Sequence, residues 1–345
     1  MLSLLFCLPL VQDPGAEAER LWAEGRRVEA VDRNAAELAR RPDDAELRAL
    51  LVERELEIHR YAAALEHAAL LGPDFDDERG FALYWLGRYE EALARLDSDL
   101  PDQTLLVVDA CEALGLEQET ARAIEKAADV LGRSDPRVLT WRGKVLASEG
   151  DHARAGETFR AALAQDPHLP EALFGLGRAL VRSGKRDEGL AVLRRHRELV
   201  PLFDQLVFAR KSLDLNPLHA PGHARVGDVE RAIGRIDRAL EAYRRAESLA
   251  EIDQVVPIAL RHARLQAEDR GDVEAALRVL RLAELRVTDV RLIVRAGSVL
   301  LAAKRPAEAV RELERALGLD PGDEAIRSIL REARADADDE RKTPC

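Results

Sequence analysis

The sequence predicts an all-α fold built as a solenoid of antiparallel helix pairs. The first observation is that residues 136–169 and 170–201 carry one motif twice, displaced by 34 residues. The equivalent positions are Gly143 and Gly177, Gly150 and Gly184, Ala155 and Gly189, Phe159 and Leu193, and Pro167 and Pro201. The second observation is a composition dominated by alanine, leucine, arginine and glutamate with only 4% aromatic residues, which is typical of a helical chain. A fixed period of about 34 residues indicates an array of two-helix repeats.

Each residue type in the motif has a physical reason. Gly143 and Ala155 are small residues midway along the two helices of a repeat, where they let the helix backbones approach closely. Gly150 ends the first helix, because a residue without Cβ can turn the chain. Phe159 fills the wedge toward the next repeat. Pro167 stops the second helix, since proline cannot continue the hydrogen-bond ladder.

These positions closely resemble the tetratricopeptide repeat, which has the same period. The resemblance extends over nearly the whole chain and implies a right-handed superhelix of about eight helix pairs, with a concave groove lined by the first helix of each pair. It also implies a partner protein or peptide in that groove. Some members of the family hold a C-terminal carboxylate with a fixed set of Lys, Asn and Arg. The two asparagines of this chain, Asn34 and Asn216, fall outside such places, so that specific mode is not expected.

Residues 15–135 are predicted to form degenerate repeats before the two strong ones of 136–201. Turns between the two helices are expected at Gly25, at His59-Arg60-Tyr61, at Gly87 and at Gly115. The spacing between equivalent alanines falls to 28 residues in part of this region, which predicts shortened helices.

The period slips after the strong repeats, because the spacing between equivalent glycines grows to 50 residues. Residues 202–219 are therefore predicted to form one odd helix and a linker, either half of a decayed repeat or a hinge or docking element. Three further repeats are expected in 220–323. A capping helix is expected in 324–336, because terminal repeats need a polar outer face. The charged tail 337–345 is expected to be disordered.

Charge and cysteine content exclude several classes. A net charge of −12 argues against nucleic-acid binding, for which a basic stripe is expected. The three cysteines have no metal-ligand spacing, and no disulfide is expected. Arginine greatly exceeds lysine, which suggests a GC-rich genome and a bacterial source.

Residues 1–12 form a short apolar run that resembles the apolar part of a secretory signal. We expect export to the envelope or periplasm from this run, with cytoplasmic residence as the alternative. The run could instead reflect a mis-assigned start or a strip that packs on the first repeat. It is too short to span a bilayer, and no other segment is apolar enough to be an integral membrane span.

No catalytic, metal or cofactor site is predicted. His219 and His223 have a helical metal-pair spacing, but Pro221 and Gly222 lie between them at a helix start, and a metal site would need further ligands. The acidic run of residues 74–78 lacks the glycine and the terminal glutamate of a calcium loop and is interpreted as a helix start. We therefore expect a non-catalytic interaction scaffold that needs no cofactor, with an exported assembly or structural factor of the envelope as the alternative.

Six residues are candidates for the peptide groove because they fall at inner positions of first helices. They are Arg137, Lys144, Phe174, Arg178, Arg182 and Arg231. Arginine can grip carboxylates with paired hydrogen bonds, and an aromatic ring offers an apolar anchor. The hypothesis is that an acidic segment of the partner lies there. The alternative is that these cations belong to an ordinary solvated surface.

Overall fold

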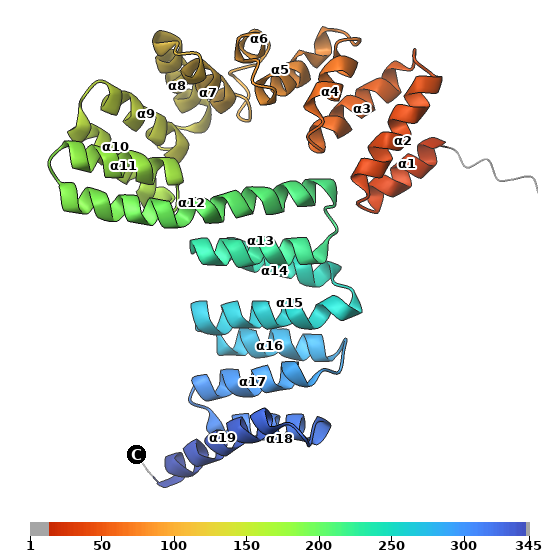
Figure 1. Cartoon of the computed structure of the whole chain (residues 1–345), viewed down its shortest axis with the longest axis vertical. Coiled ribbons are helices and arrows are strands. Elements are labelled where there is room, and N and C mark those ends of the chain that lie inside the picture. The colour runs from red at the N-terminus through yellow and green to blue at the C-terminus, as the bar shows by residue number, and fades with distance from the viewer. Residues whose placement is uncertain (1–13, 343–345) are drawn as a thin grey trace, which may run out of the picture. The chain divides into compact units, whose positions relative to one another are not determined.

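The computed structural model describes residues 14–342, and every regular element within that range is helical. Nineteen α-helices, α1 to α19, are joined by short turns, and a 3-10 helix (η1) and a π-helical segment (η2) interrupt the series. Consecutive helices pack as antiparallel pairs from α1/α2 through α17/α18, and α19 follows the last pair (Figure 1). The predicted all-α class of stacked helix pairs is confirmed.

The chain divides into two compact units, Met1–Pro201 with Asp214–Pro217, and Leu202–Leu213 with Leu218–Cys345. In the first unit, the first helices of the pairs are α1 (Pro14–Ala23), α3 (Ala45–Glu57), α5 (Asp76–Trp85), α7 (Thr104–Ala113), α9 (Pro136–Ser148) and α11 (Pro170–Arg182). The second helices are α2 (Arg27–Arg40), α4 (Tyr61–Ala68), α6 (Tyr89–Leu93), α8 (Glu117–Leu131), α10 (His152–Gln165) and the start of α12 (Arg186–Leu215), with η1 (Pro73–Phe75) before α5. The short helices α4 and α6 fit the reduced spacing of the sequence in this region.

A residue with positive φ lies in the turn inside every pair. These residues are Gly25, His59, Gly87, Gly115, Gly150, Gly184, Gly234, Gly271 and Lys304. Glycine adopts this left-handed conformation without steric cost, which explains why it occupies seven of these turns. The turns that the sequence predicts at Gly25, His59, Gly87 and Gly115 are confirmed.

The mid-helix glycines make room for a bulky side chain of the second helix. A Cβ on Gly143 would lie 2.7 Å from the ring of Phe159, and a Cβ on Gly175 of the next pair would lie 2.3 Å from the same ring. Phe159 is 1% exposed, so it fills the space between two successive first helices. The same contact recurs between Gly177 and Leu193 at 2.6 Å. In each of these repeats, a small residue on the first helix thus leaves the space that a large residue on the second helix fills.

The prediction that residues 202–216 form a separate odd helix is wrong. α12 runs without interruption through Pro201, and its last residues belong to the extra segment. At the equivalent Asp166-Pro167, the carboxylate of Asp166 accepts a hydrogen bond from the backbone N–H of His168 and the helix stops. Val200 has no such side-chain acceptor to compete with the helical ladder, so the helix continues past the proline.

In the second unit, the pairs are followed by the expected cap, which is longer than predicted. The helices are α13 (Ala220–Ile233), α14 (Ile236–Leu249), α15 (Ile252–Arg264), η2 (Leu265–Asp269), α16 (Val273–Glu284), α17 (Val290–Ala302), α18 (Pro306–Leu319) and α19 (Glu324–Lys342). Ile326, Leu330, Ala333 and Ala337 of α19 are buried on one face. That face continues beyond residue 336, so residues 337–342 are helical and not a disordered tail; residues 343–345 lie outside the described range.

None of the helices in residues 14–342 combines the length and apolar character that a membrane span requires. Residues 1–12, on which the export expectation rests, lie outside the described residues.

Candidate functional site

At one equivalent position of the first helices, the charge of the side chain changes from negative to positive along the first unit. The register is set by the turn residue of each pair, and the position six residues before it is equivalent on all first helices. In order along the first unit this position holds Glu19, Glu53, Phe81, Asp109, Lys144 and Arg178. The carboxylates therefore precede α9, and the cations lie on α9 and α11. A local basic site exists within an acidic chain.

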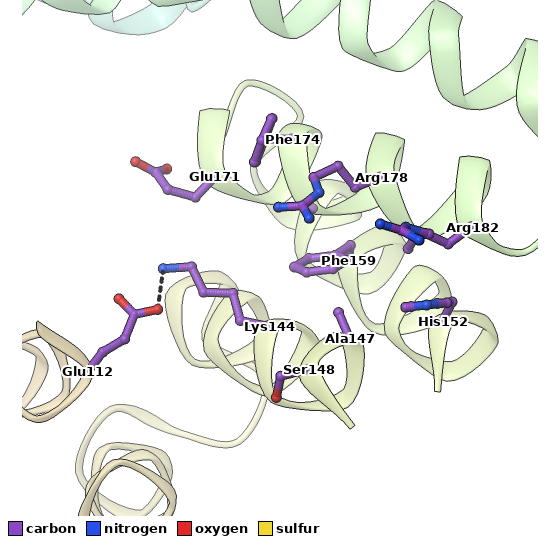
Figure 2. Close-up of a pocket in the computed structure, with 12 residues that line it drawn as sticks. Glu112, Lys144, Ala147, Ser148, His152, Phe159, Glu171, Phe174, Arg178 and Arg182 are labelled. Atoms are coloured by element: carbon purple, nitrogen blue, oxygen red, sulfur yellow. Dashed lines mark ion pairs between the residues drawn. The ribbon is translucent and has the colours of Figure 1, made fainter. Parts of the chain in front are cut away.

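A pocket of about 620 Å³ lies where these cations occur. We call it the α9–α11 pocket. Its lining residues are Glu112, Lys144, Ala147, Ser148, His152, Phe159, Glu171, Phe174, Gly175, Arg178, Ala179 and Arg182. Figure 2 shows that the carboxylates of Glu112 and Glu171 lie toward one end and Arg182 toward the other, with Arg178 between them. Most of the lining comes from the first helices α7, α9 and α11, as expected for a groove of such an array.

The cations of the pocket differ in how they are held. Lys144 Nζ lies 3.6 Å from the ring centroid of Trp141 and 3.8 Å from Glu112 Oε1. Arg178 lies over the ring of Phe174, with its guanidinium carbon 5.5 Å from the centroid. Neither Arg178 nor Arg182 forms an ion pair with any residue in the described part of the chain. Two guanidinium groups in the pocket are thus available to a carboxylate.

An apolar surface and a free polar atom complete the pocket. Phe174 is 44% exposed and its ring lies 5.2 Å, centroid to centroid, from the His196 ring of α12. Nδ1 of His152 is buried and has no hydrogen-bond partner within residues 14–342. The pocket can accept an apolar side chain beside a carboxylate.

Four of the six predicted groove residues meet in the pocket, and two do not. Arg137 pairs with the N-cap residue of its own helix: its Nη2 lies 2.8 Å from Asp135 Oδ2, and the same carboxylate accepts from the Arg137 backbone. Arg231, in the second unit, donates to Asp269 at 2.5 Å and to Glu268 at 3.2 Å. Both guanidinium groups already have carboxylate partners, and neither residue is among those that line the pocket.

Glu268 joins three arginines in the second unit. It accepts from Arg264 at 2.7 Å, Arg295 at 2.9 Å and Arg231 at 3.2 Å. The hydrogen bond from Arg264, with those of its neighbours, lowers the pKa of Glu268 from 4.5 to about 2. A lowered carboxylate pKa contributes stability above the unfolded pKa, and that stability is lost as pH falls through the folded pKa.

We expect Glu268→Gln to lower the free energy of unfolding at pH 7 by about 1 kcal/mol, a value reduced for the exposure of the side chain. The difference from wild type should disappear as pH falls from 4.5 toward 2. Urea titrations across that range measure it, with the exposed Glu332→Gln as the matched control that changes stability little. If the difference in the free energy of unfolding between Glu268→Gln and wild type stayed the same at low pH, the assigned role of Glu268 would be contradicted.

No group of three or more His, Cys, Asp or Glu residues within the described range is arranged to hold a metal ion. His219 precedes the first residue of α13, as the sequence predicts. Cys111 is buried and free, and burial raises the pKa of its thiol. A buried neutral thiol is inert.

Two family models match the strongest part of the chain. One model of the tetratricopeptide repeat matches residues 146–205 and a second matches residues 110–170. Residues 110–205 of this chain are tetratricopeptide repeats. The matched segments include α9 to α11 and all four groove residues that meet in the pocket. Tetratricopeptide repeat proteins generally serve as scaffolds for protein interactions and are typically non-catalytic.

Solved structures that are similar to this chain share little sequence identity with it. A thermophilic tetratricopeptide repeat protein of Thermus thermophilus is 22% identical over 67% of this chain and 100% of that chain, with a TM-score of 0.27. Yeast Tom70 is 13% identical over 96% of this chain and 90% of that chain, with a TM-score of 0.31. No curated protein sequence matches the repeat protein.

The six groove candidates do not include Glu112 and His152, which also line the pocket. Glu112 comes from α7, where the repeat pattern is weak, and His152 begins α10. Aligning the turn glycines Gly115 and Gly150 makes Glu112 the equivalent of Ala147 one repeat earlier, which is the signal that could have found it. His152 has no signal of that kind, since it belongs to a second helix.

Proposed function

We propose that this repeat protein is a non-catalytic scaffold that binds an acidic segment of a partner protein in the α9–α11 pocket. The single observation that carries the proposal is the pair of unpaired guanidinium groups, Arg178 and Arg182, in a pocket that also exposes Phe174. In the described chain most arginines of the first unit have a carboxylate partner, as Arg142 has Glu125.

The chemistry favours a segment with a carboxylate beside an apolar side chain. An arginine can hold a carboxylate with two parallel hydrogen bonds, and Phe174 offers an exposed ring next to Arg178. The carboxylates of Glu112 and Glu171 at the other end of the pocket would repel a uniformly acidic strand. The acidic residues of the segment therefore belong on the side of Arg178 and Arg182.

The test is binding of a labelled peptide of alternating glutamate and leucine to the full chain. We expect Arg178→Glu with Arg182→Glu to weaken binding about tenfold or more, equivalent to roughly 1.4 kcal/mol, without loss of helicity. Rising salt should weaken wild-type binding, because exposed charges are screened beyond about 8–10 Å at ordinary ionic strength.

The matched control is Arg244→Glu with Arg245→Glu on α14, which makes the same change of charge at exposed arginines outside the pocket. It should leave affinity nearly unchanged. Equal loss in the two double variants would mean that the peptide senses only total charge, and unchanged affinity in the pocket variant would exclude this site.

Export to the cell envelope, expected from residues 1–12, stays a prediction. It would make the scaffold an assembly or structural factor of the envelope. The apolar run supports it, and sequencing the N-terminus of the protein recovered from cell fractions tests it.

A further inference from the structure

A second exposed feature lies far from the pocket in sequence, on the pairs α3/α4 and α5/α6. Five aromatic side chains gather there in a chain with only 4% aromatic residues. Tyr61 and Trp85 stack with their ring centroids 5.8 Å apart and their planes 10° from parallel, and Phe81 meets both rings edge-on. Tyr84 packs edge-on against Trp85 and against Tyr89. We call Tyr61, Phe81 and Trp85, with Tyr84 at the edge, the aromatic surface.

The aromatic surface is preformed and open. Trp85 is 48% exposed although it is large and apolar. The hydroxyl of Tyr61 lies 2.6 Å from His59 Nδ1, and the hydroxyl of Tyr84 donates to Asp109 at 3.2 Å. These bonds fix the rings, so a ligand would meet a rigid surface with little loss of side-chain freedom.

Trp85 differs from the other tryptophans in lacking a cation. Arg27 and Arg54 lie over the ring of Trp22, and Lys144 lies over the ring of Trp141. No Arg or Lys within residues 14–342 lies over Trp85. A ring face of tryptophan attracts a cation within about 6 Å, and at Trp85 that interaction is unused.

The surroundings of the aromatic surface are strongly acidic. Residues 44–117 hold eighteen aspartates and glutamates against six arginines and no lysine, an imbalance as large as that of the whole chain. Glu78 lies one turn before Phe81 on the same face of α5, and one of its carboxylate oxygens is buried without a hydrogen-bond partner in the described structure. Glu53 and Asp109 occupy the positions of α3 and α7 that are equivalent to Phe81 on α5. The local field therefore favours a positive ligand.

We propose that the aromatic surface binds a basic segment of a partner protein, with an arginine stacked on Trp85 and neighbouring cations facing Glu53 and Glu78. Arginine fits better than lysine, because its planar guanidinium stacks on an aromatic face and donates hydrogen bonds in the same plane. This binding is independent of the α9–α11 pocket, which has the opposite charge preference.

The experiment measures binding of a labelled peptide of alternating arginine and glycine to the full chain by fluorescence anisotropy. We expect Trp85→Ala to weaken binding about tenfold and Trp85→Phe to retain part of the affinity, because a phenyl ring still presents a face. Glu78→Gln should weaken binding less, and its effect should shrink as salt rises. A lysine-glycine peptide should bind more weakly than the arginine peptide.

Phe208→Ala is the matched control, since Phe208 is another exposed aromatic, 63% exposed, on α12. It should leave the affinity for the arginine peptide unchanged. The proposal is overturned if Trp85→Ala and Phe208→Ala have equal effects, or if an uncharged glutamine-glycine peptide binds as tightly as the arginine peptide. Trp85→Ala should not alter binding of the acidic peptide to the pocket, so failure of either site is recognised separately.

Discussion

Phe159→Ala should lower the free energy of unfolding by about 3–5 kcal/mol, the usual cost of deleting a buried aromatic ring. The ring is 1% exposed and fills the space between Gly143 and Gly175, on the first helices of two successive pairs. Since each pair in such an array is stabilised mainly by its neighbours, the cavity would weaken the contact between two repeats. Chemical unfolding followed by circular dichroism measures the loss.

A second substitution distinguishes this contact from general damage to the core. In the wild-type chain Gly143→Ala should destabilise, because the new Cβ would lie 2.7 Å from the Phe159 ring. In the Phe159→Ala background the same Cβ has space, and alanine favours a helix over glycine by about 1 kcal/mol. The effect of Gly143→Ala should therefore change sign. The same sign in both backgrounds would contradict the shared-space assignment, and Phe208→Ala at an exposed ring should cost well under about 1 kcal/mol.

This contact also shows why so much of the fold follows from the sequence. A glycine in each turn and a small residue opposite a large one are local requirements, and the 34-residue period repeats them. His59 could be placed in a turn although it is not glycine, because its neighbours keep the register. It adopts a φ of 64°, which costs a histidine more than a glycine.

Helix ends were harder to predict, because they depend on competition between side chain and backbone. Pro167 and Pro201 are equivalent in sequence, but only the first follows an aspartate that offers the backbone another hydrogen bond. The end of α19 depends on Ala337, whose burial continues the apolar face of the helix into a stretch that is highly charged. Composition alone predicts disorder there.

Only part of the candidate site could be predicted, because the sequence does not show which side chains pair with one another. Register places Arg137 and Arg231 on first helices correctly, but it does not reveal their partners. Asp135 is the N-cap of the helix that carries Arg137. Asp269 ends the π-helical segment η2, an irregularity with no sequence signature. Arg178 and Arg182 remain open because no such carboxylate approaches them in the described chain.

The other large effect is expected at a buried arginine of the first unit, Arg54, whose side chain is 6% exposed. Its Nη2 donates to both carboxylate oxygens of Glu19 at 2.7 Å, and its guanidinium carbon lies 4.6 Å from the ring centroid of Trp22. Nη1 is buried without a partner in the described structure. Glu19 itself is 58% exposed, so the two partners of this ion pair are not equivalent.

We expect Glu19→Ala to cost about 2–3 kcal/mol, because it leaves the charge of Arg54 buried without its carboxylate. Arg54→Met should change stability by less than about 1 kcal/mol, since a buried ion pair replaced by an apolar side chain of similar volume is often neutral. Removing the exposed partner should thus cost more than replacing the buried one.

The double variant decides between this account and a simple loss of contacts. With methionine at position 54 no charge remains buried, so Glu19→Ala should then cost little, and the double variant should be more stable than Glu19→Ala alone. Glu17→Ala on the same helix breaks an ion pair with Arg33 at 3.0 Å in which Arg33 is 46% exposed, and it should cost well under about 1 kcal/mol. Additive losses in the double variant would show that desolvation of Arg54 is not what makes the loss of Glu19 costly.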